Sequence, residues 1–248
     1  MGKEKILVGM TKETKQGCKI EVVDVVNCNN ITVRFEDTGF LKQTTMNYFR
    51  LGVIRNPYRK SVHGVGYIGE TTEIISNKNH KYSQWSGLLY RGYSKKFKDN
   101  NPSYKDVIVC EEWHNYQVFA EWFEANYNPE IMDGWHLDKD ILIKGNKIYS
   151  PEMCCFVPQE INKLFCKSNS TRGDFPIGVK KANKKYESYV TKKGKNIRVG
   201  LFNTPEEAFQ AYKIAKEEHI KEIANKWKEL IDPKVYEALI NYQVEITD

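Results

Sequence analysis

The chain has 248 residues, of which 40% are hydrophobic and 28% are charged. This composition is ordinary for a globular protein, and the length suits two or three small domains or one large one. No apolar run approaches the roughly 20 residues that a membrane-spanning helix needs, and residues 1–6 lack the long apolar core of a secretion signal. We therefore expect a cytoplasmic protein that does not contact membranes.

Positive charge is concentrated in one segment. Residues 171–200 hold nine Lys or Arg and two acids, a local net charge of +7, whereas the whole chain carries +6, so the remainder sums to about −1. A basic segment on a nearly neutral body can neutralise phosphates and release their counterions. The distribution favours a polyanionic partner, and the alternative is a set of solvated loops.

Six cysteines are scattered along the chain without a C-x-x-C pair. Structural zinc sites normally show close ligand pairs, so the sequence does not predict zinc. Cys154 and Cys155 are adjacent, and we expect both to be buried structural thiols.

Residues 1–68 have the pattern of a small β-domain. Strands are expected at 19–26, 31–36 and 40–45, because alternating apolar and polar residues are separated by segments with turn chemistry. We expect these strands to belong to a five-stranded, Tudor-like barrel. Two roles are open for it, namely binding of a peptide or nucleic acid and a purely structural role.

Aromatic residues dominate the next segment. An early helix is expected around residues 85–91. Three- and four-residue spacing then predicts one apolar helix face. This face comprises Trp113, Tyr116, Phe119, Trp122, Phe123 and Tyr127. We interpret it as core packing rather than as a platform for stacked bases.

Residues 135–164, called the ββα segment below, have the pattern of strand, polar loop, strand and helix. The first strand ends in a carboxylate, and the following helix carries an amide. A carboxylate and an amide in these positions can jointly hold one hard divalent cation, with water as the remaining ligands. His136, Asp138 and Asp140 alternate along the strand, so we expect them on one face.

Residues 177–227 combine a lysine-rich pattern of three strands with a capped helix. Successive strand residues alternate between faces. One face is expected to carry Lys185, Glu187, Tyr189, Thr191 and Lys193. At the helix start, Thr204 is the expected N-cap, Pro205 takes the first helical position and Glu207 completes a capping box. A short helix is expected at 233–242.

The same residues resemble the plant Apetala-two, or ethylene-response-factor, DNA-binding domain. The resemblance lies in Gly178-Val179-Lys180, Lys185-Tyr186, Val199-Gly200-Leu201-Phe202 and Thr204-Pro205-Glu206-Glu207-Ala208. In that family the sheet lies in the major groove, which implies groove contacts by Lys180, Tyr189, Thr191, Asn196 and Arg198. Phosphate contacts, which need less geometric precision, are expected from Lys181, Lys184, Lys185, Lys192, Lys193 and Lys195.

The ββα segment resembles the HNH, or ββα-metal, nuclease motif of phage and mobile-element proteins, some of which combine it with an Apetala-two-like domain. The resemblance implies a Mg²⁺ or Mn²⁺ site at Asp138 and Asn162. The family's water-activating histidine corresponds to Lys139, and its orienting asparagine falls near Met153. His136 is the candidate to replace the missing base.

Together these features predict an α+β protein. Its expected parts are a β-barrel domain (1–68), an HNH-like domain (69–170), an Apetala-two-like domain (171–230), and a C-terminal helix and tail (231–248). The first functional hypothesis is a metal-dependent homing-type endonuclease that cuts double-stranded DNA in a bacterial cytoplasm. The second is a phage-type DNA-binding regulator without catalytic activity. The third is a counter-defence factor that binds a host protein.

Overall fold

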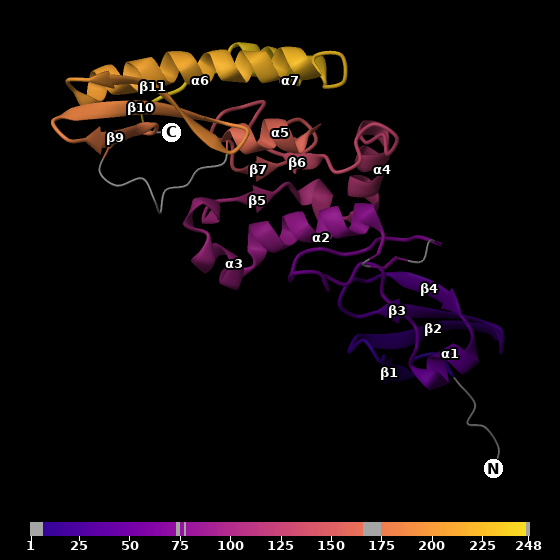
Figure 1. Ribbon diagram of the computed structural model, residues 1–248. Helices are drawn as coiled ribbons and strands as arrows, with labels where there is room; N and C mark the ends of the chain where they lie inside the picture. Colours follow the sequence, from indigo (N-terminus) through magenta and orange to yellow (C-terminus); the bar gives the residue numbers. More distant parts are fainter. Residues whose placement is uncertain (1–6, 73–74, 77, 166–174, 247–248) are drawn as a thin grey trace. The chain divides into compact units, whose positions relative to one another are not determined.

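The computed structural model describes residues 7–72, 75–76, 78–165 and 175–246. The protein is 36% helix and 25% strand, with several open sheets, which confirms the expected α+β class (Figure 1). The chain divides into two compact units, residues 1–123 and 124–248, and the division falls within helix α4 (Tyr116–Asn126). The domain boundary expected at residue 170 lies outside the described residues.

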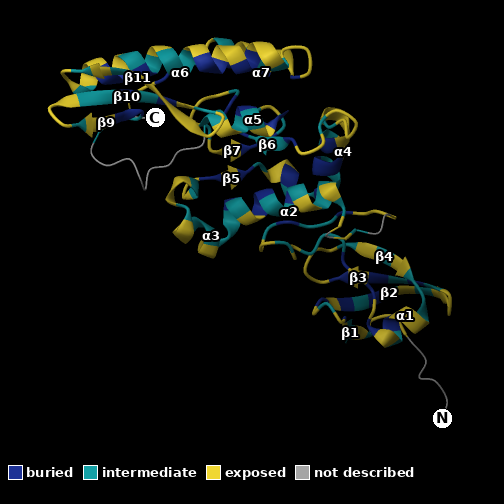
Figure 2. Cartoon of the chain, in the orientation of Figure 1, coloured by how far each residue is buried: buried dark blue, intermediate teal, exposed yellow. Residues whose placement is uncertain are grey.

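The first unit begins with a four-stranded antiparallel sheet in sequential order. Its strands are β1 (Thr11–Glu13), β2 (Lys19–Asn27), β3 (Asn30–Phe35) and β4 (Leu41–Thr44). Alternation turns one side of β2 and β3 inward. The resulting core contains Ile20, Val22, Ile31, Val33 and Phe35, none of which is exposed (Figure 2).

The five-stranded barrel expected within residues 1–68 is wrong. In the described part of this segment the sheet is open, with β1 and β4 at its edges. After β4 the chain forms helix α1 (Met46–Leu51) instead of a closing strand. Thr45 starts this helix by accepting a hydrogen bond from Tyr48 N at 3.2 Å, and Gly52 ends it in a left-handed conformation. Phe49 of α1 is buried in the sheet core, so α1 rather than a fifth strand covers this part of the core.

Helices make up most of the remaining first unit. They are α2 (His80–Tyr93), α3 (Lys95–Asn100) and the 3₁₀ turns η1 (Pro102–Tyr104) and η2 (Glu111–His114), with the short strand β5 (Ile108–Val109) before η2. Trp85 Nε1 donates to the Trp113 carbonyl at 2.7 Å and so joins α2 to η2. The expected aromatic face is core packing, because Trp113, Tyr116 and Phe119 are fully buried.

The second unit contains the ββα segment. It is formed by β6 (His136–Asp138), β7 (Ile148–Tyr149), β8 (Cys155–Val157), α5 (Gln159–Asn162) and the 3₁₀ turn η3 (Lys163–Phe165). Strand β6 pairs antiparallel with β8, and Asp138 lies opposite Cys155. Cys154 and Cys155 are both buried, as expected.

The second unit also contains a three-stranded antiparallel sheet in the order β11–β10–β9. Its strands are β9 (Val179–Ala182), β10 (Lys185–Lys192) and β11 (Lys195–Phe202). Helix α6 (Pro205–Trp227) packs across one face of this sheet, and α7 (Pro233–Ile240) packs against α6. The expected capping box is present, because Glu207 N donates to Thr204 Oγ1 at 3.2 Å and the Glu207 carboxylate accepts from Thr204 N. None of the described helices is long and apolar enough to cross a lipid bilayer.

Candidate functional site

The register of the β9–β11 sheet sorts its residues into two faces. Directly opposed residues of antiparallel strands share a face. Ser188 and Val190 are buried under α6, so they mark the face that the helix covers. The alternate residues and their partners form the opposite side, called the outer face below. It carries Lys180, Glu187, Tyr189, Thr191, Asn196 and Arg198.

Contacts between side chains connect this outer face. Tyr189 lies opposite Arg198, and Thr191 lies opposite Asn196. The second pair shares a hydrogen bond of 2.7 Å between Thr191 Oγ1 and Asn196 Oδ1. Lys180 Nζ lies 5.3 Å from the centre of the Tyr189 ring, within the range of a cation–π contact. The five positions to which the Apetala-two resemblance points therefore fall on one continuous surface.

Three of the six lysines expected to contact phosphates lie on the side of α6 rather than on the outer face. Lys181 lies opposite Tyr186, and Lys192 lies opposite Lys195. By alternation these residues share the face of Ser188, on the side of α6. The outer face therefore does not include Lys181, Lys192 or Lys195.

Two lysines of the sheet are paired with carboxylates of the protein itself. Lys192 Nζ lies 2.7 Å from Glu222 of α6, and Lys180 Nζ lies 3.2 Å from Glu187 on the neighbouring strand. Hydrogen bonds from Lys192 and His219 lower the pKa of Glu222, so this carboxylate stays ionised. Sequence reasoning missed the first pair, because its partners are separated by 30 positions.

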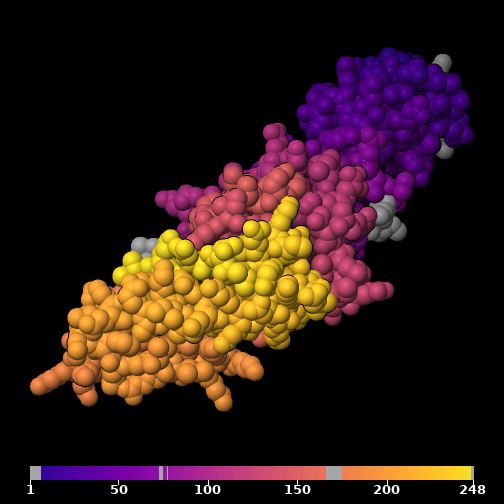
Figure 3. Space-filling model, turned by 90° about the horizontal axis from the view of Figure 1, so that it is seen from above, coloured from indigo at the N-terminus to yellow at the C-terminus, as the bar shows by residue number. Residues whose placement is uncertain are grey.

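The remaining lysines lie at the two turns of the sheet, at opposite ends of β10. Lys184 and Lys185 are exposed at the first turn, and Lys193 is exposed at the second. Asn183 and Lys193 have positive φ angles of 55° and 52°, which shape these tight turns. In the space-filling view, the region that includes the β9–β11 sheet is orange, and several long side chains project from it (Figure 3).

The ββα segment brings two of its candidate residues together. Asn162 Nδ2 lies 3.1 Å from His136 Nδ1, which joins α5 to β6. At the end of β6, Asp138 Oδ1 accepts hydrogen bonds from Asp140 N at 2.8 Å and from Ile141 N at 2.9 Å. The Asp138 carboxylate therefore closes the turn that follows the strand.

Lys139, at the position of the water-activating histidine, is buried. Its ammonium lies 3.1 Å from the Asp140 carboxylate and 5.9 Å from the centre of the Tyr149 ring. An ammonium held in an ion pair has no lone pair to accept a proton from water, so this geometry does not suit a general base.

Burial raises the pKa of Asp138 to about 6, and the Asp140 carboxylate adds to the rise. The two backbone N–H donors act in the opposite direction. The anionic form of Asp138 is therefore disfavoured in its surroundings.

The expected metal site does not fit this arrangement. A hard divalent cation takes several oxygen ligands. One oxygen of Asp138 is already engaged with two backbone N–H groups. Throughout the described ranges, no three His, Cys, Asp or Glu side chains are grouped so that they could hold a metal ion. The expected cluster of His136, Asp138 and Asp140 thus lacks a metal-binding geometry.

Comparisons of the chain with protein-family models, with curated proteins and with solved structures gave no match. The two resemblances seen in the sequence therefore do not place the chain in a family. The outer face of the β9–β11 sheet and the ββα segment stay as the two candidate sites.

Proposed function

We propose that the protein binds double-stranded DNA through the outer face of the β9–β11 sheet and that it acts as a DNA-binding protein without nuclease activity. The main support is the cross-strand arrangement of Tyr189 with Arg198 and of Thr191 with Asn196 on the face opposite α6. The major groove of B-DNA admits a two-stranded β-ribbon, and β10 and β11 form such a ribbon.

The chemistry of the outer face suits the edges of base pairs. Arginine forms paired hydrogen bonds with guanine, and asparagine does so with adenine. Arg198 and Asn196 lie two residues apart on the same strand and on the same face. Thr191 adds a hydroxyl group and Tyr189 adds an aromatic ring beside them. Hydrogen-bonding groups and a ring are therefore available to base pairs on the same face.

The two turns supply cations beyond the ends of this ribbon. Lys184 and Lys185 lie at one turn and Lys193 at the other. Phosphates line both edges of the major groove, so cations at both ends of a strand in the groove are placed to contact them. Three such contacts predict a slope of about −2.7 for the logarithm of the affinity against the logarithm of salt concentration.

The ββα segment supports binding without cleavage. Asp138 is used to close a turn, and Lys139 is paired with Asp140. The interaction between His136 and Asn162 then has a structural role, in which it ties α5 to β6.

Fluorescence anisotropy with a labelled DNA duplex tests this proposal. The purified protein should bind the duplex at low ionic strength, and the affinity should fall with added salt at the slope given above. A labelled single strand of the same sequence is the control, because it lacks a major groove and should bind more weakly. The absence of duplex binding at low ionic strength would refute the proposal.

A further inference from the structure

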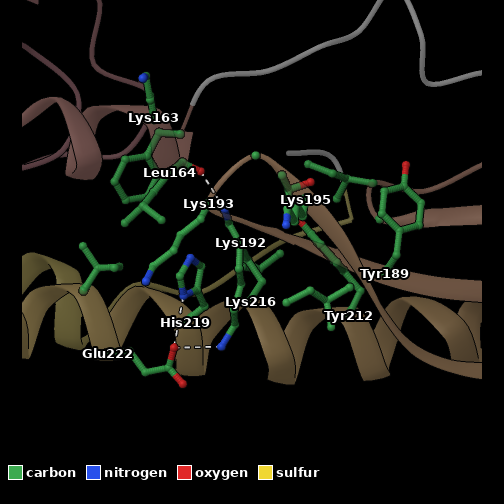
Figure 4. Close-up of a pocket in the computed structure, with 18 of the residues that line it drawn as sticks. Lys163, Leu164, Tyr189, Lys192, Lys193, Lys195, Tyr212, Lys216, His219 and Glu222 are labelled. Atoms are coloured by element: carbon green, nitrogen blue, oxygen red, sulfur yellow. Dashed lines mark hydrogen bonds and ion pairs between the residues drawn. The ribbon is translucent and has the colours of Figure 1, made fainter.

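A groove of about 900 Å³ lies on the helix side of the β9–β11 sheet, within the second unit (Figure 4). Helix α6 forms one side of the groove with residues between 212 and 223. The β10–β11 hairpin forms another side, and the α5–η3 stretch faces α6 across the opening. Pockets for small molecules typically enclose roughly 300–1,000 Å³, so this groove has room for a ligand of that class.

The lining carries an excess of positive charge, with five lysines against two glutamates. Glu160 accepts hydrogen bonds from Lys226 and Trp227, neither of which lines the groove. Glu222 accepts from Lys192 and His219. Both carboxylates are therefore already balanced by cations or donors, and the remaining lysines give the groove an attraction for anions.

The turn between β10 and β11 places Lys193 and Lys195 at the edge of the groove. Lys193 and Gly194 have φ angles of 52° and 74°, which is the conformation of a tight two-residue turn between Lys192 and Lys195. The hydrogen bond from Lys226 is the largest cause of the lowered pKa of Glu160, and the charge of Lys193 also contributes. Lys193 therefore lies close enough to Glu160 for its positive charge to influence that carboxyl group.

A hydrogen bond across the groove holds its walls together. Lys216 Nζ of α6 donates to the carbonyl oxygen of Leu164 at 2.8 Å, and Figure 4 shows this bond as a dashed line. The groove is thus formed by contacts within the folded unit rather than by loosely placed side chains.

Apart from Thr191 and His219, the rest of the lining is apolar or aromatic. It includes Phe165, Ile197, Tyr212, Ile223 and Tyr242. The rings of Phe165 and Tyr242 lie 4.8 Å apart between centres and form a packed aromatic pair. Rings and apolar side chains beside cations are what an aromatic base joined to phosphate requires.

We propose that this groove binds a nucleoside phosphate, whose phosphates are held by Lys193 and Lys195 and whose base lies against the apolar and aromatic lining. The ligand can be a free nucleotide or the terminal nucleotide of a DNA strand, because both present the same base and phosphate. The groove shares Tyr189 and Thr191 with the outer face, but neither Asn196 nor Arg198 lines it. Nucleotide binding can therefore be tested apart from duplex binding through Arg198, which lies outside the groove.

Isothermal titration calorimetry with ATP as the probe tests the groove. The double variant Lys193→Gln/Lys195→Gln removes two lysines of the lining. Its matched control is Lys184→Gln/Lys185→Gln, which removes the same charge from the other turn of the same sheet, outside the groove. The wild type and the control should bind ATP, and the groove variant should bind at least about tenfold more weakly. An equal loss in both variants, or no ATP binding by the wild type, would overturn the proposal.

Further probes separate the parts of the proposal. Inorganic triphosphate should bind more weakly than ATP, and equal affinity would overturn the role of the base. A short single-stranded oligonucleotide with a terminal phosphate separates the two sources of the ligand. If it competes with ATP, the groove accepts a strand end; if it does not, the ligand is a free nucleotide. The variant Arg198→Gln should keep full ATP affinity, so a failure of duplex binding is distinguishable from a failure of the groove. All four lysines are exposed, so the substitutions should leave thermal unfolding unchanged. Unchanged unfolding then excludes misfolding as the cause of weaker ATP binding.

Discussion

Gly178 lies directly against the ring of Tyr212, and a Cβ atom added to this glycine would come within 2.0 Å of the ring. Gly178 also has a φ of 74°, which side-chain-bearing residues rarely adopt. The glycine thus allows the chain entering β9 to approach α6 closely. We predict that Gly178→Ala lowers the free energy of unfolding by about 2–4 kcal/mol, from backbone strain and overpacking together. Urea unfolding followed by circular dichroism measures this loss.

Gly194 provides a matched control for that experiment. Its φ is also 74°, but a Cβ atom added there would meet nothing within 4 Å. Gly194→Ala should therefore show only the backbone part of the effect, about 1–2 kcal/mol. Equal losses in the two variants would contradict the role of the Tyr212 contact.

Arg198 and Lys192 should differ in their effect on duplex binding. Arg198 lies on the outer face, whereas Lys192 is paired with Glu222 on the side of α6. We expect Arg198→Gln to weaken binding about tenfold, and Lys192→Gln to change it by less than about twofold. Anisotropy titrations at one fixed salt concentration measure both. If Lys192→Gln is as harmful as Arg198→Gln, the DNA does not dock through the outer face alone.

The pH dependence of stability should reflect the raised pKa of Asp138. Because this pKa is about 6 in the folded protein and 3.8 by default, the folded state keeps a proton that the unfolded chain has already lost. Stability from this group is therefore present at low pH and falls as the pH rises from about 4 to about 6, by roughly 2–3 kcal/mol. Urea unfolding across this range measures the fall.

Asp138→Asn should remove that fall. The amide oxygen of asparagine can still accept the hydrogen bonds from Asp140 N and Ile141 N, and it carries no charge to bury. Above about pH 6 the variant should be at least as stable as the wild type. Asp99→Asn, at an exposed position, is the control and should keep the pH dependence of the wild type. A variant of Asp138 with an unchanged pH profile would show that this carboxyl is not the source.

Plasmid DNA should remain supercoiled when it is incubated with the protein and either Mg²⁺ or Mn²⁺. The reason is that Asp138 closes a turn and Lys139 is ion-paired, so the ββα segment presents neither the ligands nor the base that cleavage needs. Agarose gel electrophoresis of the plasmid gives the result. Nicking by the wild type that Asp138→Ala abolishes would instead support the nuclease hypothesis raised by the HNH-like pattern.

Local signals in the sequence were sufficient for much of the second unit. Thr204, Pro205 and Glu207 predicted the start of α6, because the capping box depends on groups only three residues apart. Alternation also predicted that Glu187, Tyr189 and Thr191 share a face of β10, and these residues lie on the outer face. In the first unit, Thr45 and Gly52 are residues that typically begin and end a helix, and they flank α1. A barrel was nevertheless expected there.

The sequence by itself determined the α+β class, the order of the elements at residues 177–227 and the concentration of positive charge there, since each depends on neighbours along the chain. Only the tertiary structure decided which lysines belong to the outer face, which line the groove and which pair with carboxylates. Lys192 meets Glu222 because α6 packs across the sheet and brings together residues 30 positions apart. Periodicity cannot predict such a pair, because it describes each element alone and not the contacts between elements.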